Sequence, residues 1–252
     1  MLDRRGFLRR ASAALTTLLL GGCDRLSASP TVQNLLSNAE DVNRWLQRQL
    51  IGGHAMAREY SDADLSPQFR ANGSTDPDDP TYRRFAAKGF VDWRLEVDGL
   101  VDRPARLSLA ELRQWPARTQ ITRHDCVEGW SCIGKWTGVK LADVLRHVGL
   151  RPGARYVVFH CADSLEGSPD RYYESIDMVD AAHPQTILAY AMNDQPLPIA
   201  HGAPLRLRVE RQLGYKMAKY IMRIEVVDDL SQIGGGRGGY WEDRGYEWYA
   251  GI

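Results

Sequence analysis

Alternation of apolar and polar side chains with a period of two is the feature that most restricts the fold of this chain. In 93–98 three apolar residues alternate with Arg, Glu and Asp, and the same pattern returns in 205–209 and 220–226. Alternation of this kind indicates a strand with one buried face. Continuous apolar runs at 156–159 and 187–192 indicate strands that are buried on both faces. Strands therefore dominate the predicted fold.

Short helices are expected between these strands. Residues 141–148 show helical periodicity and are followed by Gly149, a helix stop. A Ser-x-x-Glu pattern at Ser108 predicts a capping box that opens a short helix, which Pro116 ends. A longer amphipathic helix is expected over 35–50. We therefore predict the α+β class, with mixed β-sheets and short helices.

The amino terminus has the layout of an export signal. Arg4 and Arg5 precede the apolar run 11–20, and together they resemble a twin-arginine signal. The run is too short to span a bilayer, since a spanning helix needs roughly 20 apolar residues. The Leu-Gly-Gly-Cys that follows resembles a lipoprotein processing site, so we expect 1–22 to be removed and Cys23 to be acylated, with ordinary cleavage as the alternative. These features predict a periplasmic protein with a lipid anchor in the inner membrane.

Charge and length exclude some classes of protein. The chain has 32 basic and 32 acidic residues, and removal of 1–22 would leave a net charge of about minus three. Nucleic acid is therefore not the expected partner. We predict a helix and linker in 23–70 and one domain in 71–252. Within them, 52–89 is rich in Asp, Pro, Ser and Arg without a clear period, which predicts a long surface segment.

Three cysteines remain once the lipid-site cysteine is set aside, namely Cys126, Cys132 and Cys161. An odd number in an oxidising compartment is not a simple disulfide framework. Cys126 could pair with Cys132, unless a metal occupies its thiolate. Zinc is a further alternative, with His124 and His160 as additional ligands. The chain's His-x-Cys and His-Cys sequences do not have the spacing of the common zinc motifs.

Two separated segments carry a family resemblance. The first is His-Asp-Cys-Val-Glu-Gly-Trp-Ser-Cys at 124–132, and the second is His-Gly-Ala-Pro-Leu-Arg-Leu-Arg-Val-Glu-Arg-Gln-Leu-Gly-Tyr-Lys-Met-Ala-Lys at 201–219. They resemble the molybdenum-ligand loop and the cofactor-binding segment of the sulfite oxidase and bacterial sulfoxide reductase catalytic-subunit superfamily. The resemblance extends over about 72–252. It implies an oxidoreductase with a sulfite-oxidase-like molybdopterin-binding domain, in which Cys126 would be the protein ligand of molybdenum, as a soft thiolate suits.

The resemblance also implies which residues hold the molybdenum-molybdopterin cofactor. Arg206, Lys216 and Lys219 are expected to meet the phosphate of the pyranopterin. The alternative is that they are solvated charges at the ends of strands. Two positions depart from the sulfoxide reductase pattern, because His201 stands in place of Asn and Cys161 in place of Thr. The implied cofactor contacts are Asn72, Cys161, His201, Arg206, Lys216, Met217, Ala218 and Lys219, with Met217 and Ala218 contributing backbone amides.

Glu128 is the second catalytic candidate, since the family has an acidic residue near the metal. Burial would raise its pKa and suit it to relay protons. The alternative is a structural ion pair with an arginine such as Arg123. A carboxylate here would repel sulfite, by about 4 kcal/mol for unit charges about 4 Å apart at an effective dielectric of roughly 20. We therefore expect a neutral small-molecule substrate such as a sulfoxide, with sulfite oxidation or a non-enzymatic envelope binding lipoprotein as the alternatives.

Electron transfer requires a partner. The sequence has no haem-attachment Cys-x-x-Cys-His and no iron–sulfur cysteine run. We therefore expect a membrane electron-transfer partner, either a cytochrome b-type subunit or a quinone.

A glycine-rich stretch precedes the aromatic carboxyl end. The Gly-x-Gly-x-x-Gly of 234–239 matches the dinucleotide fingerprint only formally, because no helix or further acidic residue follows at the required spacing. We interpret it as a flexible approach to an aromatic tail. The tail is expected to pack against the body of the protein or to dock a partner, and its members are Tyr240, Trp241, Tyr246, Trp248 and Tyr249.

Overall fold

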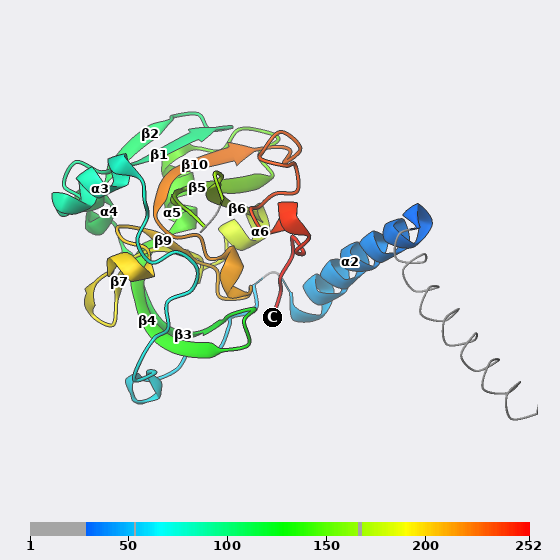
Figure 1. Ribbon diagram of the computed structural model, residues 1–252, viewed down its shortest axis with the longest axis horizontal. Helices are drawn as coiled ribbons and strands as arrows, with labels where there is room; N and C mark the ends of the chain where they lie inside the picture. Colours follow the sequence, from blue (N-terminus) through cyan, green and yellow to red (C-terminus); the bar gives the residue numbers. More distant parts are fainter. Residues whose placement is uncertain (1–28, 53, 166–167) are drawn as a thin grey trace, which may run out of the picture. The chain divides into compact units, whose positions relative to one another are not determined.

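The computed structural model describes residues 29–52, 54–165 and 168–252 (Figure 1). The predicted signal peptide and the predicted lipid site at Cys23 lie outside the described residues.

The chain divides into two units, residues 1–50 and residues 51–252. The first contains most of helix α2 (Pro30–Ile51), which confirms the helix predicted over 35–50. None of the described helices is both long enough and apolar enough to cross a membrane.

The described part of the second unit contains two five-stranded sheets (Figure 1). The first has the order β2-β1-β10-β5-β6, in which β1 runs parallel to β10 and the other neighbours are antiparallel. The second has the antiparallel order β3-β4-β7-β8, with β9 also paired to β7. The predicted α+β class with mixed sheets is confirmed. The strands are β1 (Arg94–Gly99), β2 (Ala105–Ser108), β3 (Ala117–Asp125), β4 (Ser131–Lys140), β5 (Tyr156–Ser164), β6 (Arg171–Asp177), β7 (Ile187–Met192), β8 (Gln195–Pro196), β9 (Arg206–Arg208) and β10 (Ile221–Val227).

Short helices connect the strands, and their ends follow the predicted chemistry. At the start of one of them the Ser108 hydroxyl accepts a hydrogen bond from the backbone N–H of Glu111, whose carboxylate in turn accepts from the N–H of Ser108 at 2.8 Å. Another ends at Gly149, with φ +70°. The helices of this unit are α3 (Pro80–Ala87), α4 (Leu109–Gln114), α5 (Leu141–Val148) and α6 (Met178–Ala181), with 3₁₀ turns at Asp62–Asp64, Ile199–His201, Gly214–Lys216 and Glu242–Arg244.

Helix α3 corrects the expectation that 52–89 has no regular structure. Asp79 caps it by accepting a hydrogen bond from the backbone N–H of Tyr82 at 2.6 Å, and Pro80 occupies the first helical position. The ring of Tyr82 is fully buried, and its hydroxyl donates to the carbonyl of Ala203 at 2.7 Å. The helix was missed because it is short and its apolar face, Tyr82, Phe85 and Ala86, spans little more than one turn.

The amino-terminal part of this unit also pairs with the second sheet. The backbone N–H of Tyr60 donates to the carbonyl of Ile121 at 2.9 Å, and Glu59 forms a β-bridge with Thr122. The compact unit therefore includes residues that we had assigned to a linker ending at 70.

Burial along the strands follows the alternation in β1 but not in β9. Leu95 and Val97 lie in the core, whereas Asp98 accepts a hydrogen bond from Arg223 at 2.8 Å on the other face. In β9 the two arginines, Arg206 and Arg208, are as fully buried as their apolar neighbours. Strand β9 thus carries charge into the interior of the protein.

Candidate active site

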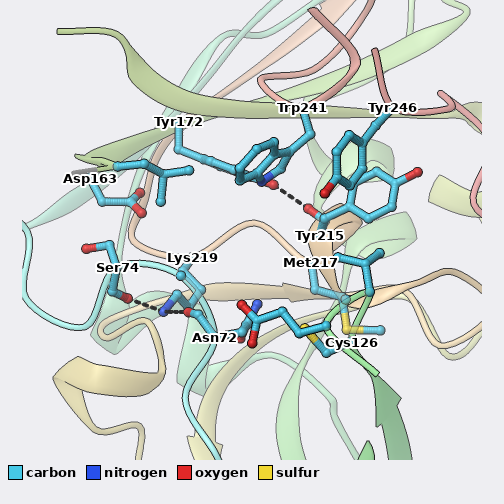
Figure 2. Close-up of a pocket in the computed structure, with 15 residues that line it drawn as sticks. Asn72, Ser74, Cys126, Asp163, Tyr172, Tyr215, Met217, Lys219, Trp241 and Tyr246 are labelled. Atoms are coloured by element: carbon cyan, nitrogen blue, oxygen red, sulfur yellow. Dashed lines mark hydrogen bonds between the residues drawn. The ribbon is translucent and has the colours of Figure 1, made fainter. Parts of the chain in front are cut away.

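A pocket in the second unit brings together residues that are far apart in the sequence (Figure 2). Its lining comes from 72–74, from the turn at 126–128, from the end of β5, from 214–219 and from the C-terminal segment. Five of the residues predicted from the sequence line it, namely Asn72, Cys126, Glu128, Met217 and Lys219.

Cys126 lies in the turn of the hairpin formed by β3 and β4. Its backbone N–H donates to the carbonyl of Trp130 at 2.9 Å, and its own carbonyl accepts from the N–H of Gly129, whose φ is +83°. The turn leaves the sulfur half-buried at the pocket, as Figure 2 shows. Burial raises the pKa of the thiol. A bound cation would act in the opposite direction and favour the thiolate.

Glu128 lies at the mouth of the pocket rather than in its interior. Its side chain is 53% exposed and accepts a hydrogen bond from Nε1 of Trp130 at 2.9 Å. Arg70 is the nearby cation, at 3.7 Å, and it also lies over the ring of Trp130. The expectation that Glu128 is buried was wrong, because a hairpin turn holds it in solvent. The suggested ion pair with Arg123 does not form either, since Arg123 binds Asp125 at 2.9 Å.

Lys219 ties the segment before α3 to the cofactor-binding segment. Its ammonium donates to the carbonyl of Asn72 at 2.6 Å, to that of Ser74, and to that of Ala200 at 3.3 Å (Figure 2). Burial, with help from the neighbouring Arg206, lowers its pKa to about 7. Its hydrogen-bond partners are neutral carbonyls, and the carboxylate of Asp163, which lines the same pocket, acts against this lowering of the pKa.

Arg206 is a buried cation with donor atoms that are unpartnered in the described part of the chain. The guanidinium is fully buried and donates from Nη1 to the carbonyl of His201 at 3.0 Å. Its Nε and Nη2 atoms, and Nδ1 of His201, have no hydrogen-bond partner among the described residues. Burial, reinforced by Arg208, lowers the pKa of Arg206 to about 9. The alternative that Arg206, Lys216 and Lys219 are solvated charges at strand ends is wrong, because all three side chains are buried.

Lys216 is placed differently from the expectation. Its ammonium lies between the carboxylates of Glu174 and Glu242, at 2.5 Å from each, and all three side chains are buried. Burial disfavours the charge, but the two carboxylates hold the pKa of Lys216 above its usual value. The side chain therefore has two carboxyl partners within the protein and is not free to meet a phosphate.

Of the remaining predicted contacts, Met217 alone is among the lining residues of this pocket. Met217 lines it, with its sulfur 3.2 Å from Nδ1 of His124, and its backbone N–H is taken by the carbonyl of Gly214. Ala218 is buried, and its carbonyl accepts from the N–H of Leu207 at 2.8 Å. Cys161 is also buried and lines a second cavity, so burial raises the pKa of its thiol.

Several lining residues were not identified as site residues from the sequence, and Asp163, Trp241 and Tyr246 are the most informative of them. Asp163 is buried at the end of β5, and its Oδ1 has no partner among the described residues. Burial raises its pKa to about 6, although Lys219 opposes the shift. Trp241 and Tyr246 reach the pocket from the carboxyl end. The sequence predicted that the aromatic tail packs against the body of the protein or docks a partner. It could not show which of the rings reach the site.

The residues present fit a molybdopterin cofactor. A half-buried thiol and the ammonium of Lys219 both line the pocket, and Arg206, which has unpartnered donors, is a buried neighbour of Lys219 outside the lining itself. Such donors suit a phosphate, and a thiolate suits molybdenum. Cys126, Cys132 and Cys161 are free among the described cysteines, so the suggested disulfide is not formed. Nowhere in the described part of the chain do three or more His, Cys, Asp or Glu side chains gather as a metal site, and the zinc alternative finds no support.

Comparison with known proteins agrees with this fit. The pattern of the oxidoreductase molybdopterin binding domain matches residues 84–233. The chain is 39% identical over 248 residues to a protein of Azospira oryzae named as protein-methionine-sulfoxide reductase subunit YedZ1, which covers 98% of this chain and 87% of that protein. It is 36% identical over 242 residues to the protein-methionine-sulfoxide reductase catalytic subunit MsrP of Xanthomonas campestris pv. campestris, over 91% of this chain and 71% of the relative.

A solved structure shares the fold. The sulfane dehydrogenase SoxCD from Paracoccus pantotrophus aligns with a TM-score of 0.50 and 20% identity, over 60% of this chain and 45% of that chain. At this identity the likeness concerns the arrangement of the sheets and helices and not the reaction.

Proposed function

This chain belongs to the family of oxidoreductases with a molybdopterin-binding domain, and from that premise we propose that it reduces sulfoxides. Membership makes the chain a molybdopterin-dependent enzyme of the sulfite oxidase family, which rules out the non-enzymatic lipoprotein. The relatives' names point to the sulfoxide of methionine residues in proteins as the substrate.

The observation that carries the proposal is that Cys126 and Lys219 line the same pocket. Cys126 would hold molybdenum, and Lys219 with Arg206 would hold the phosphate of the pyranopterin. When bound, this cofactor supplies two-electron oxygen-atom transfer chemistry. Reduction of a sulfoxide to a thioether consumes two electrons and two protons and releases one water. The chain's own part is to hold the cofactor, admit the sulfoxide and deliver protons.

Glu128 is placed to deliver those protons. Its carboxylate lines the pocket and is 53% exposed, so it can exchange protons with solvent while it remains beside the site. The hydrogen bond from Trp130 Nε1 keeps it at the mouth of the pocket. We assign it as a proton relay between solvent and the substrate oxygen.

The charge argument against sulfite is weaker than the sequence suggested. Glu128 is largely solvated and Arg70 lies 3.7 Å away, so the repulsion of an anion at the mouth is screened and partly neutralised. The preference for a sulfoxide therefore rests on the relatives' names and on an apolar wall of the pocket. Sulfite oxidation remains the second candidate, because two basic groups, Lys219 in the lining and its neighbour Arg206, are available to an anion.

One experiment separates these two reactions. The cofactor-loaded chain is assayed with a reduced viologen dye against dimethyl sulfoxide and a peptide that contains methionine sulfoxide, and in parallel with sulfite and an electron acceptor. We expect dye oxidation that depends on the sulfoxide. Efficient sulfite oxidation without sulfoxide turnover would replace the proposal by its rival. Cys126→Ser protein is the matched negative control in both arms.

We further propose the compartment and the electron source. The twin-arginine pattern at Arg4 and Arg5 and the Cys at 23 support export to the periplasm and a lipid anchor in the inner membrane. A membrane electron-transfer subunit, such as a b-type cytochrome that draws on quinol, would then supply the two electrons. The relatives named as subunits of an enzyme support a partner of this kind.

A further inference from the structure

The carboxyl end of the chain enters the pocket although it lies outside the matched family domain. That domain ends at residue 233, yet Trp241 and Tyr246 line the pocket with Cys126. A segment beyond the domain that shares the cofactor's pocket is a natural place for features that differ between members of one family.

The rings of this segment form one aromatic side of the pocket. Trp241 lies 5.1 Å from Tyr246, and Tyr246 meets Tyr215 edge-on at 5.2 Å. The hydroxyl of Tyr215 donates to the carbonyl of Glu247 at 2.5 Å, which ties the ring of the 3₁₀ turn to the tail. We call these three residues, Trp241, Tyr246 and Tyr215, the aromatic wall.

The aromatic wall lies opposite the polar part of the pocket. Figure 2 shows Asp163, Ser74 and Lys219 on one side and the aromatic wall on the other, with Cys126 below. The polar side suits the phosphate and the donor and acceptor groups of a pterin. The aromatic wall has no charged group and suits an apolar group bonded to sulfur, since sulfur and aromatic rings attract each other.

A buried ion-pair cluster holds the aromatic wall in place. Glu242 follows Trp241 directly, and its carboxylate binds the ammonium of Lys216, which also binds Glu174 of β6. A side chain at Gly239 would collide with the carboxylate of Glu242, so the tail is closely packed at this point. Lys216 follows Tyr215 and precedes Met217, and both of these neighbours line the pocket. The cluster therefore joins the tail to the cofactor-binding segment.

We propose that Trp241 and Tyr246 determine substrate specificity by binding the apolar substituents of a sulfoxide, and that Lys216 positions them through Glu242. The inference rests on the proposed sulfoxide reduction and names the subsite that selects the substrate. It explains why the ammonium of Lys216 binds two carboxylates instead of a phosphate. It also predicts a preference for sulfoxides that carry aryl or extended alkyl groups over dimethyl sulfoxide.

The first test uses Trp241→Leu and Tyr246→Leu in the cofactor-loaded full chain. With reduced viologen as donor, the KM for methyl phenyl sulfoxide should rise about tenfold, as expected for the loss of a hydrophobic contact. The KM for dimethyl sulfoxide and both kcat values should change much less. The inhibition constant of methyl phenyl sulfone should rise in parallel, and this readout does not depend on turnover. Trp45→Leu, on α2 and outside the pocket lining, is the matched control.

Molybdenum and pterin content distinguishes the substrate wall from a cofactor wall. We expect both variants to retain wild-type content. Loss of the cofactor, with an unchanged KM in the molecules that keep it, would assign these rings to the pterin and overturn the inference. Unchanged KM and inhibition constants at full cofactor content would overturn it as well. A wild-type enzyme inactive on every sulfoxide would instead reject the proposed function, and the inference with it.

The second test concerns the positioning role of the cluster. Glu242→Ala removes the anchor, whereas Glu242→Gln can still accept the hydrogen bond from Lys216. We expect the alanine variant to raise the KM for methyl phenyl sulfoxide about tenfold at unchanged kcat, and the glutamine variant to restore it toward wild type. An equal fall in kcat for both sulfoxides in the alanine variant, without rescue by glutamine, would contradict a positioning role.

Discussion

The Nη1 atom of Arg208 lies 3.0 Å from Nδ1 of His124. Because an arginine can only donate, Nδ1 accepts this hydrogen bond and the ring proton resides on Nε2. The remaining donors of Arg208 bind Glu210 at 2.9 and 2.5 Å. His124 stands two residues before Cys126, so this buried chain of contacts holds the end of β3 from which the thiol extends.

Replacement of Arg208 by Met should destabilise the protein strongly. It would leave Glu210 as a buried carboxylate with its ion-pair partner removed, and breaking a buried ion pair costs about 3 to 5 kcal/mol. Urea unfolding of the cofactor-free chain measures this loss. An unfolding free energy within about 1 kcal/mol of wild type would show that the pair does not hold the strand.

Arg206→Met is the matched variant with the opposite outcome. Arg206 is equally buried but has no carboxylate partner among the described residues, so the cofactor-free chain should be as stable as wild type or more stable. Cofactor retention should fall by about 10- to 150-fold, because a charge-assisted contact contributes about 1.5 to 3 kcal/mol. Pterin fluorescence after release measures retention. Wild-type pterin content would exclude Arg206 from the phosphate site.

Cys126→Ser should abolish turnover and leave the protein folded. The change removes the proposed metal ligand but keeps the turn, whose hydrogen bonds come from the backbone. Circular dichroism and the ratio of molybdenum to pterin measure the two effects. Cys132→Ser, at a half-buried free cysteine outside the pocket lining, should keep wild-type turnover. If both variants keep it, the ligand assignment is wrong.

Lys219 should make the stability of the cofactor-free chain depend on pH. Burial lowers its folded pKa from 10.5 to about 7, so between these values the unfolded chain binds the extra proton. The free energy of unfolding should therefore rise as the pH increases from about 7 toward 10. Below about pH 7 Lys219 is protonated in both states, so its cost to stability is at its largest and no longer changes with pH. Urea titrations at several pH values compare wild type with Lys219→Met. If the free energy of unfolding changed with pH in the same way in both proteins, burial would not disfavour the charge of Lys219.

Cys23→Ser should release the protein from the membrane, because acyl chains at this residue would provide the anchor. Fractionation and the mature amino terminus decide the outcome. Unchanged membrane association, with a mature chain that does not begin at Cys23, would exclude lipidation. In a separate variant, replacement of Arg4 and Arg5 by Lys should leave precursor in the cytoplasm, and normal export would point to the general secretory route.

Much of the fold followed from local patterns. The apolar run at 187–192 is β7, and the periodic segment 141–148 is α5. Both were predictable because their sequence neighbours supply the pattern that defines them. Helix α3 was not, because its apolar face spans little more than one turn and packs against residues that are distant in the sequence, such as Ala203.

The candidate site was predictable only in part. The turn that carries Cys126 is a local structure, so its sequence motif located it. The exposure of Glu128 was misjudged, since solvent access depends on what packs over a turn. Asp163, Trp241 and Tyr246 came from separate regions without a shared motif, and only folding places them in one pocket.

By itself, the sequence determined the α+β class, the family and the loop that presents Cys126. Each was indicated by patterns that are local, since every strand, helix or motif involved is a short run of consecutive residues. The tertiary structure decided the roles of the charges. Arg206, Lys216 and Lys219 looked equivalent in the sequence, yet one has unpartnered donors, one binds two carboxylates and one binds backbone carbonyls. The physical reason is that the energy of a buried charge depends on its nearest partners. Those partners lie as many as 147 residues away in the sequence and are chosen by the packing of the whole domain.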